Sequence, residues 1–449
     1  MRERLLGWLR IRPGEARLVF ALGAILFIND TTMGIAKVVS VSGFLSEVKD
    51  YYILLVWAVD MGLLVLATAL QSLVIDRFHR VKLLGGLIVI LGVFYAVLPV
   101  TFALDGFPVE ISYTILYLLT DQQWLVFPLV FWILISDIFD PGQGRRLIPV
   151  IGSFAFAGAI VGLGIAQLDT MVHYGPVKLL LFNAGIFLLA WLVVLSTLRK
   201  VRVRQTSRES ITITQAFSGG WDFIRSVPAF RYLSIGMLAA GVTLTVLLYD
   251  ALSDASLELG SGFQSFYALY SLAIAVASIL LQFMSGKVIE KLGLKDSFLI
   301  LPFTMLAGSL VAFFVPGYWS SSASQGVARI SLQTVDQSSR KAFQALVPDE
   351  KRGRVSIFID SYLPSIGTIF GSLLTFGIVA VGLSLSASRQ FYSSLYLGLG
   401  ILGGAVAVAS FFFMRSVYDK SLFNWQLKRR SRGASVLDGL SFSDDGEGK

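Results

Sequence analysis

The sequence predicts an all-α membrane protein with about twelve transmembrane helices in two pseudo-symmetric, six-helix halves. Of the 449 residues, 55% are hydrophobic and only 15% are charged, whereas soluble domains carry about 25% charged residues. The apolar residues fall in unbroken runs of about twenty, the length with which an α-helix crosses roughly 30 Å of hydrocarbon. An internal repeat also relates the first part of the chain to the second.

Each apolar run predicts one span, and charged or glycine-containing segments separate the runs. The twelve predicted spans are 17–41, 52–75, 82–104, 112–136, 147–168, 177–198, 230–252, 264–286, 297–316, 318–339, 356–382 and 391–414.

The spans divide the chain into two halves and three polar segments. The N-terminal half comprises residues 17–198, and the C-terminal half comprises residues 230–415. Residues 1–16 alternate basic and apolar side chains, which predicts an amphipathic helix at the membrane interface. We expect residues 199–229 to form a cytoplasmic linker and residues 416–449 a cytoplasmic tail.

The repeat is visible as landmarks that recur in the same order at nearly constant spacing. They are the acidic loop residues Asp76 and Glu290 (214 apart), the span residues Asp121 and Asp336 (215), and the glycine pairs Gly158/Gly367 and Gly162/Gly371 (209 each). Agreement of three independent landmarks is typical of an internally duplicated transporter fold.

The basic residues lie mostly on one side of the predicted topology. With both termini cytoplasmic, 32 of the 37 Lys and Arg residues fall in cytoplasmic segments, the bias that orients membrane proteins. The net charge of +8 is therefore explained by the basic residues that orient the chain in the membrane, and we expect no nucleic-acid partner. The sequence predicts a multi-pass protein of a bacterial inner membrane, surrounded by the lipid bilayer.

The composition also argues against several chemistries. The chain has no cysteine and two histidines, His79 and His173, which argues against disulfides, thiol catalysis and the common metal centres. We find no nucleophile–base pair and no phosphate-binding Gly-x-x-x-x-Gly-Lys-Ser/Thr motif. We therefore expect no cofactor, no metal and no enzymatic activity, and any transport must be driven by exchange or an ion gradient.

The loops after the second and eighth spans resemble the signature of the major facilitator superfamily. They read SLVIDRFHRVKLL (72–84) and GKVIEKLGLKDSF (286–298). The second fits the pattern more closely, because Ser72 and His79 stand where the first loop usually has glycine. FWILISDIFDPGQGRRLIPVIG (131–152) and PDEKRGRVSIFID (348–360) more narrowly resemble the ATP:ADP antiporter, or nucleotide transporter, family.

Ionisable residues inside the predicted spans are the candidate functional residues, because a charge at the bilayer centre costs about 2.5–3.5 kcal/mol. There are eight of them: Asp30, Lys37, Asp60, Asp121, Asp250, Arg329, Asp336 and Asp360. The superfamily resemblance implies that spans one, four, seven and ten line a central cavity, and six of the eight lie on these spans.

Helical spacing places some of these residues on common faces. Asp30 and Lys37 are seven residues apart, as are Arg329 and Asp336, so each pair shares one face. The predicted substrate or coupling-ion site comprises Asp30, Lys37, Asp121, Gln122, Arg329 and Asp336.

Three further aspartates could either take part in ion coupling or have a structural role only. Asp60 could form a structural pair with Lys37, Asp250 could be solvated near a span end, and Asp360 could brace the eleventh span.

The two signature loops carry the candidate gating residues Asp76, Arg77, Arg80, Glu290 and Lys291. They would pair across the cytoplasmic ends when that side closes. The alternative is that they only anchor the topology.

These features predict a secondary transporter working by alternating access. The family resemblance implies exchange of nucleotides or another phosphate-bearing solute. Six aspartates against one lysine and one arginine favour instead a proton-coupled carrier of a cationic or amphiphilic solute. A membrane scaffold without transport activity is the third alternative.

Overall fold

The computed structural model describes residues 11–12, 14–74, 79–198, 221, 224–344, 347 and 355–438. Most of the predicted interfacial helix (1–16), most of the linker (199–229) and the gating candidates Asp76 and Arg77 lie outside these described residues. Every regular element among the described residues is helical.

Twelve principal helices form the bundle. The N-terminal half contains α2 (Ala16–Glu47), α3 (Tyr52–Val74), α4 (Arg80–Ala103), α5 (Val109–Ile138), α6 (Pro141–Val172) and α7 (Gly175–Thr197). The C-terminal half contains α9 (Pro228–Leu259), α10 (Phe263–Leu292), α12 (Ile300–Phe314), α13 (Tyr318–Ser331), α16 (Leu363–Ser384) and α17 (Arg389–Asp438). Shorter pieces are η2 (Gly260–Gly262), α11 (Leu294–Ser297), the π-helix η3 (Leu332–Asp336), α14 (Gln337–Gln344) and the π-helix η4 (Phe358–Tyr362).

Nine helical runs among the described residues are long and apolar enough to cross a membrane. One of them, Pro228–Leu292, contains two of the principal helices, and the apolar part of α3, Tyr52–Thr68, is slightly shorter. The serine-rich helix α13 completes the set of twelve, so the predicted helix count is confirmed.

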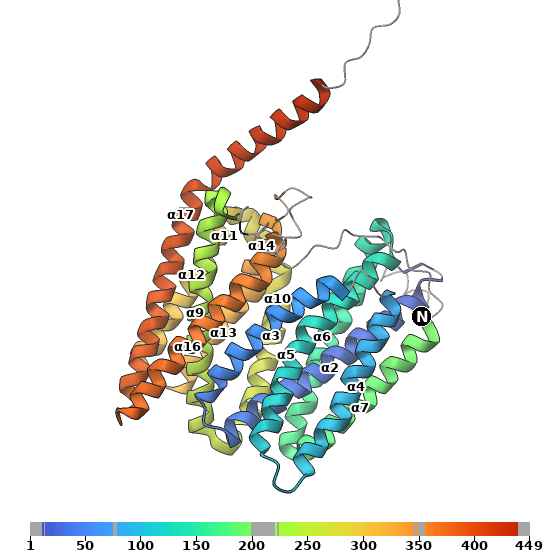
Figure 1. Ribbon diagram of the computed structural model, residues 1–449, viewed down its shortest axis with the longest axis vertical. Helices are drawn as coiled ribbons and strands as arrows, with labels where there is room; N and C mark the ends of the chain where they lie inside the picture. The colour runs from blue at the N-terminus through green and yellow to red at the C-terminus, as the bar shows by residue number, and fades with distance from the viewer. Residues whose placement is uncertain are drawn as a thin grey trace, which may run out of the picture.

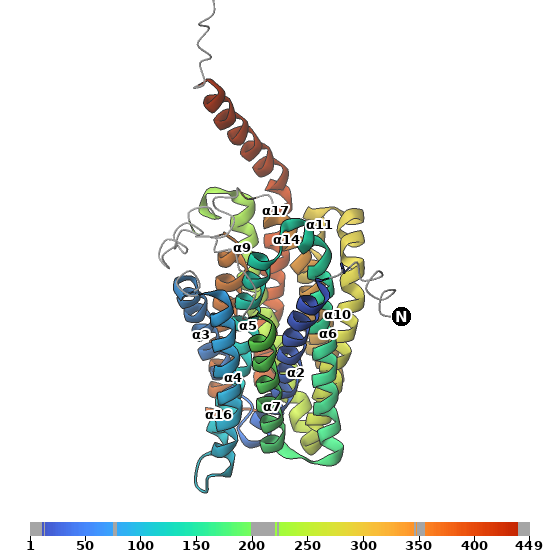
Figure 2. The same ribbon diagram turned by 90° about the vertical axis from the view of Figure 1, so that its right-hand side faces the viewer.

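The chain reverses direction at each connection, so the helices alternate between two ends of the bundle. We call the end where α7 finishes and α9 begins the linker end, and the opposite end the far end. Helix α17 continues past the linker end and projects from the bundle (Figures 1 and 2).

Glycines set the closest helix contacts in both halves. A Cβ atom on Gly158 or Gly162 of α6 would overlap backbone carbonyl oxygens of α2, and one on Gly367 of α16 would lie 2.8 Å from the carbonyl oxygen of Leu238 in α9. Because only glycine permits such backbone approach, the repeated glycine pairs specify equivalent packing of α2 on α6 and of α9 on α16.

The two halves lie side by side (Figure 1), and their most extensive contacts are between two helix pairs, α3 with α16 and α6 with α10. These pairs are equivalent under the repeat, since α3 and α10 are the second helices of their halves and α16 and α6 the fifth. The pseudo-symmetry that the sequence predicts therefore extends to the interface.

Side-chain hydrogen bonds between described residues of the two halves lie at the far end. Gln167 of α6 donates to Ser265 of α10 at 2.9 Å, and Gln264 of α10 donates to Asp169 of α6 at 3.0 Å. Ion pairs near the linker end, such as Arg80 with Asp137, join residues of a single half. The structure therefore holds the halves together at the far end.

Candidate functional site

An ion pair between Lys37 of α2 and Asp121 of α5 lies in the middle of the N-terminal half. Lys37 Nζ is 2.5 Å from Asp121 Oδ1, and the two side chains keep 26% and 22% of their surface exposed. The structure therefore gives Lys37 a different partner from Asp60, which was the structural alternative predicted from the sequence. Lys37 is also seven residues from Asp30, but the two do not form an ion pair.

Aromatic groups orient this ion pair. Tyr117, one turn before Asp121, accepts a hydrogen bond from Lys37 Nζ at 3.2 Å and another from Trp57 Nε1 of α3 at 2.8 Å. The ammonium also lies 4.3 Å from the centroid of the Tyr117 ring, a geometry that stabilises a cation. Lys37 is therefore neutralised and held in place.

Gln122 directs its amide to a second carboxyl group. Its Nε2 atom donates to Oδ1 of Asp60 on α3 at 3.0 Å, and Asp60 is fully buried, with 0% of its surface exposed. The neighbouring Gln123 donates to Asn29 of α2 at 3.0 Å and accepts from Tyr95 of α4 at 2.7 Å. Gln123 is thus a structural residue, whereas Gln122 belongs to the candidate site.

Arg329 on α13, in the C-terminal half, lies at about the same depth in the bundle as Lys37 and Asp121. Lys37, Asp121 and Arg329 lie ten to twelve residues from the far ends of their helices, which is about 15–18 Å at 1.5 Å per residue. Among the described residues Arg329 makes no hydrogen bond and no ion pair. Within the described part of the chain its charge therefore has no ionic partner.

Two tyrosines of α10 lie near the two cations. Tyr267 is within electrostatic range of Lys37 and Tyr117, and Tyr270, one turn further, is within range of Arg329. Tyr270 also donates to the backbone carbonyl of Ser322 at 2.9 Å. The cation of each half is therefore linked to the same helix of the C-terminal half.

Asp336, which the sequence places on one face with Arg329, forms a separate cluster near the linker end. The π-helix η3 lies directly after α13 and changes the side-chain register. Asp336 consequently pairs with Arg340 at 2.8 Å, and Arg340 also approaches Asp360 at 3.4 Å. Lys341 completes the cluster with a 2.6 Å contact to Asp360, so two acids are balanced by two bases.

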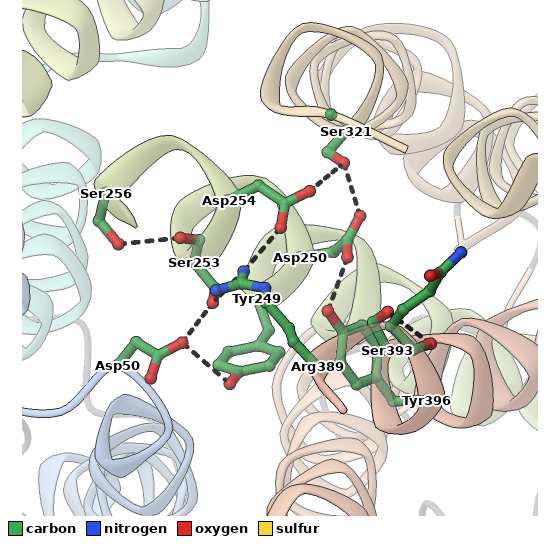
Figure 3. Close-up of polar contacts among 12 residues, drawn as sticks. Asp50, Tyr249, Asp250, Ser253, Asp254, Ser256, Ser321, Arg389, Ser393 and Tyr396 are labelled. Carbon is green, nitrogen blue, oxygen red and sulfur yellow. Dashed lines mark hydrogen bonds and ion pairs between the residues drawn. The ribbon is translucent and has the colours of Figure 1, made fainter. Parts of the chain in front are cut away.

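Asp250 belongs to a polar network toward the far end (Figure 3). It is only 2% exposed, so the prediction that it is solvated near a span end is wrong. Tyr396 of α17 donates to Asp250 at 2.8 Å, and Ser321 of α13 donates to it at 2.7 Å. These contacts join three helices of the C-terminal half.

The same network continues into the N-terminal half. Arg389 donates to Asp254 at 2.7 Å and to Ser253 at 3.0 Å. Asp50, in the connection from α2 to α3, accepts hydrogen bonds from Ser253 and, at 3.2 Å, from Tyr249 (Figure 3). This network therefore closes the far end of the interface between the halves.

The remaining predicted residues are Asp30 and the described gating candidates, which belong to none of the clusters above. Asp30 accepts one long hydrogen bond, 3.5 Å from Asn29, and forms no ion pair among the described residues. Arg80 pairs with Asp137 of its own half at 3.3 Å, while Glu290 and Lys291 lie exposed at the end of α10. Pairing of the gating residues across the halves stays a prediction.

Sequence reasoning missed the residues that contact these charges. Tyr117 and Asp254 each lie four residues from a predicted acid on the same helix, a spacing that places side chains together. That spacing could have identified them. Tyr267, Tyr270 and Arg389 carry no comparable local signal, because they belong to helices distant in the sequence.

No family model and no curated protein matches this sequence. In contrast, 254 chains of solved structures match its fold. A bacterial homologue of the human lysosomal transporter Spinster, inward-facing and unoccupied, superposes with a TM-score of 0.62 at 15% identity, covering 91% of this chain and 98% of that chain. The fold that this chain shares with the Spinster homologue is the major facilitator fold.

Other neighbours share that fold. The nucleoside transporter NupG gives a TM-score of 0.62 at 12% identity, covering 89% of this chain and 99% of that chain. An auto-inhibited peptide transporter of the POT family gives 0.65 at 10% identity, covering 89% and 97%. All three neighbours are named as transporters. The narrower resemblance to ATP:ADP antiporters stays a prediction.

Proposed function

We propose that this protein is a secondary transporter that binds an anionic group of a small solute through Arg329 and moves it by alternating access. The observation that most strongly supports this proposal is that Arg329 lies at mid-membrane depth without an ion pair or hydrogen bond among the described residues. A lone charge there costs about 2.5–3.5 kcal/mol, and a bound anion offsets that cost.

The balance of charges supports this assignment. Lys37 is neutralised by Asp121, and the linker-end cluster balances two acids with two bases. Of the eight ionisable span residues, only Asp30, Asp60, Asp250 and Arg329 have no ion pair in the described part of the chain. Arg329 is the one basic group among those four.

A phosphate-bearing solute, such as a nucleotide, fits the surroundings of Arg329. The planar guanidinium binds phosphate or carboxylate oxygens in a bidentate manner, and Tyr270 provides an aromatic ring near it. The resemblance to ATP:ADP antiporters and the fold similarity to a nucleoside transporter favour the same class of solute.

The uneven contacts between the halves support alternating access. Hydrogen bonds tie the halves at the far end, whereas the ion pairs near the linker end lie within each half. Rocking the halves would break the first set and bring the linker-end residues together. We assign the linker end to the cytoplasmic side of a bacterial inner membrane, because the basic residues concentrate in its segments.

Counterflow in proteoliposomes tests the proposal. Vesicles loaded with unlabelled ADP should accumulate external labelled ADP, and the same assay is run with inorganic phosphate. Arg329→Gln should reduce exchange at least tenfold, and Arg329→Lys should retain part of it. Lys178→Gln, which removes an exposed charge near the far end, is the matched control. Exchange by Arg329→Gln at the wild-type rate would exclude the anion site.

A second candidate function is proton-coupled transport of a cationic or amphiphilic solute. The observation favouring it is the position of Asp30 on α2, where the carboxylate has no basic partner among the described residues. Uptake of labelled tetraphenylphosphonium without exchange of ADP or phosphate would favour this candidate. Loss of that uptake in Asp30→Asn would assign the cation to Asp30.

A further inference from the structure

Asp60 is a buried carboxyl group with only half of its hydrogen-bonding capacity used. Its Oδ1 atom accepts from Gln122, while its Oδ2 atom is buried and has no partner among the described residues. Burying an unpaired carboxylate oxygen is strongly unfavourable. A protonated carboxyl group would instead carry an O–H donor at that oxygen.

The acceptor for such a donor is adjacent. Asp121 directly precedes Gln122, whose amide binds Asp60. It lies within electrostatic range of Asp60, and its Oδ1 atom is already paired with Lys37. Two carboxylates therefore share a single ammonium group. With both ionised, the cluster carries one uncompensated negative charge, which one added proton removes.

The other helices packed against α3 provide no second cation. Helix α5 contributes Tyr117 beside Asp121, and α16 contains no titratable residue. The nearby η4 carries Tyr362 and Asp360, and the carboxylate of Asp360 is bound by Lys341 at the linker end. The protonation of Asp60 therefore depends mainly on Asp121 and Lys37.

We propose that Asp60, Asp121 and Lys37 together form a proton-binding site that couples proton movement to solute transport. The coupling role rests on the proposed transport function, but proton binding does not. One proton enters the cluster, forms an O–H bond at Asp60 Oδ2 and is shared with Asp121.

The position of the Asp60–Asp121–Lys37 cluster gives protons access to Asp60 and couples its protonation to movement of the two halves. Lys37 and Asp121 are partly exposed, so a proton reaches buried Asp60 through Asp121. Helix α3, which carries Asp60, packs against α16 of the other half. Movement of the halves against each other therefore changes the surroundings of Asp60, and loss or gain of its proton biases that movement.

The transport test compares two measurements on the same vesicles. Uptake of labelled ADP is measured with an imposed pH gradient and, separately, as counterflow at equal pH. Asp60→Asn should lower the ratio of gradient-driven uptake to counterflow at least tenfold, and Asp60→Glu should largely restore it. Asp105→Asn, an exposed far-end acid, should keep the wild-type ratio. A wild-type ratio in Asp60→Asn would overturn the coupling role.

Infrared spectroscopy tests the site without any substrate. The wild-type protein should show a protonated carboxyl band at neutral pH, because burial without a basic partner of its own favours the uncharged form of Asp60. The band should persist in Asp30→Asn and disappear in Asp60→Asn. Absence of the band from the wild type, or its persistence in Asp60→Asn, overturns the site even if ADP is not transported. If Asp60→Asn does not fold, loss of the band in Asp30→Asn overturns it equally.

Discussion

Asp169, in the last turn of α6, accepts a hydrogen bond at 3.0 Å from Gln264, in the first turn of α10. Two residues earlier on α6, Gln167 donates to Ser265 at 2.9 Å. These bonds connect the two halves at the far end, so they must break when that end opens.

Cross-linking this contact should stop transport. The chain has no cysteine, so the double variant Gln167→Cys/Ser265→Cys carries the only two thiols. A short, reducible bifunctional reagent should abolish labelled-ADP counterflow, because the far end is then held closed, and a reductant should restore it. The control is Ser278→Cys/Gln333→Cys, which links two hydrogen-bonded residues of one half. Continued exchange after verified cross-linking at 167 and 265 would show that this end does not open.

The packing of α2 on α6 should not tolerate even a methyl group. A Cβ on Gly162 overlaps the carbonyl oxygen of Thr31, whereas one on Gly164 meets no atom within 4 Å. Gly162→Ala should lower the free energy of unfolding by about 1–3 kcal/mol. Gly164→Ala should change it by about 0.5 kcal/mol or less. Thermal unfolding in detergent measures both, and equal effects would contradict the close approach.

Lys37 and Asp121 should be strongly coupled energetically. Removing one member leaves the other charge unpaired in the bundle, so Lys37→Met and Asp121→Asn should each cost about 3 kcal/mol. The double variant should cost much less than the sum of the two, because the charged pair is removed as a whole and the remaining acid, Asp60, can stay buried as an uncharged, protonated carboxyl group. A double-mutant cycle of thermal stabilities gives the coupling, and additive effects would show that the ion pair contributes little.

The contact between Glu15 and Arg146 should depend on pH. The Arg146 guanidinium, 2.7 Å away, holds the pKa of Glu15 below its ordinary value of 4.5, against a smaller opposing effect of burial. Stability from this pair is therefore present above pH 4.5 and lost as pH falls through the lowered pKa.

Glu15→Gln should therefore lower the melting temperature at neutral pH, by an amount equivalent to about 1 kcal/mol or less. The difference from the wild type should vanish in acid. Glu110→Gln, at an exposed position in the first turn of α5, is the control. A difference that is constant with pH would contradict the assignment to this ion pair.

Much of the fold could be predicted because its determinants are local. Apolar runs of about twenty residues specify helices whatever lies beside them, and the structure places a helix at each predicted span. The recurring glycines indicated close packing in the fifth and eleventh spans, and they contact the first and seventh. The pattern does not indicate where a helix changes to π geometry, so the separation of Arg329 from Asp336 could not be anticipated.

The sequence by itself determined which residues carry charge inside the membrane and approximately how deep each one lies. Only the tertiary structure decided that Lys37 pairs with Asp121, that Asp60 binds Gln122, and that Arg329 has no ion pair with any residue that the structure describes. The reason is physical: depth follows from position along one helix, whereas partnership depends on how helices distant in the sequence are rotated and packed against each other.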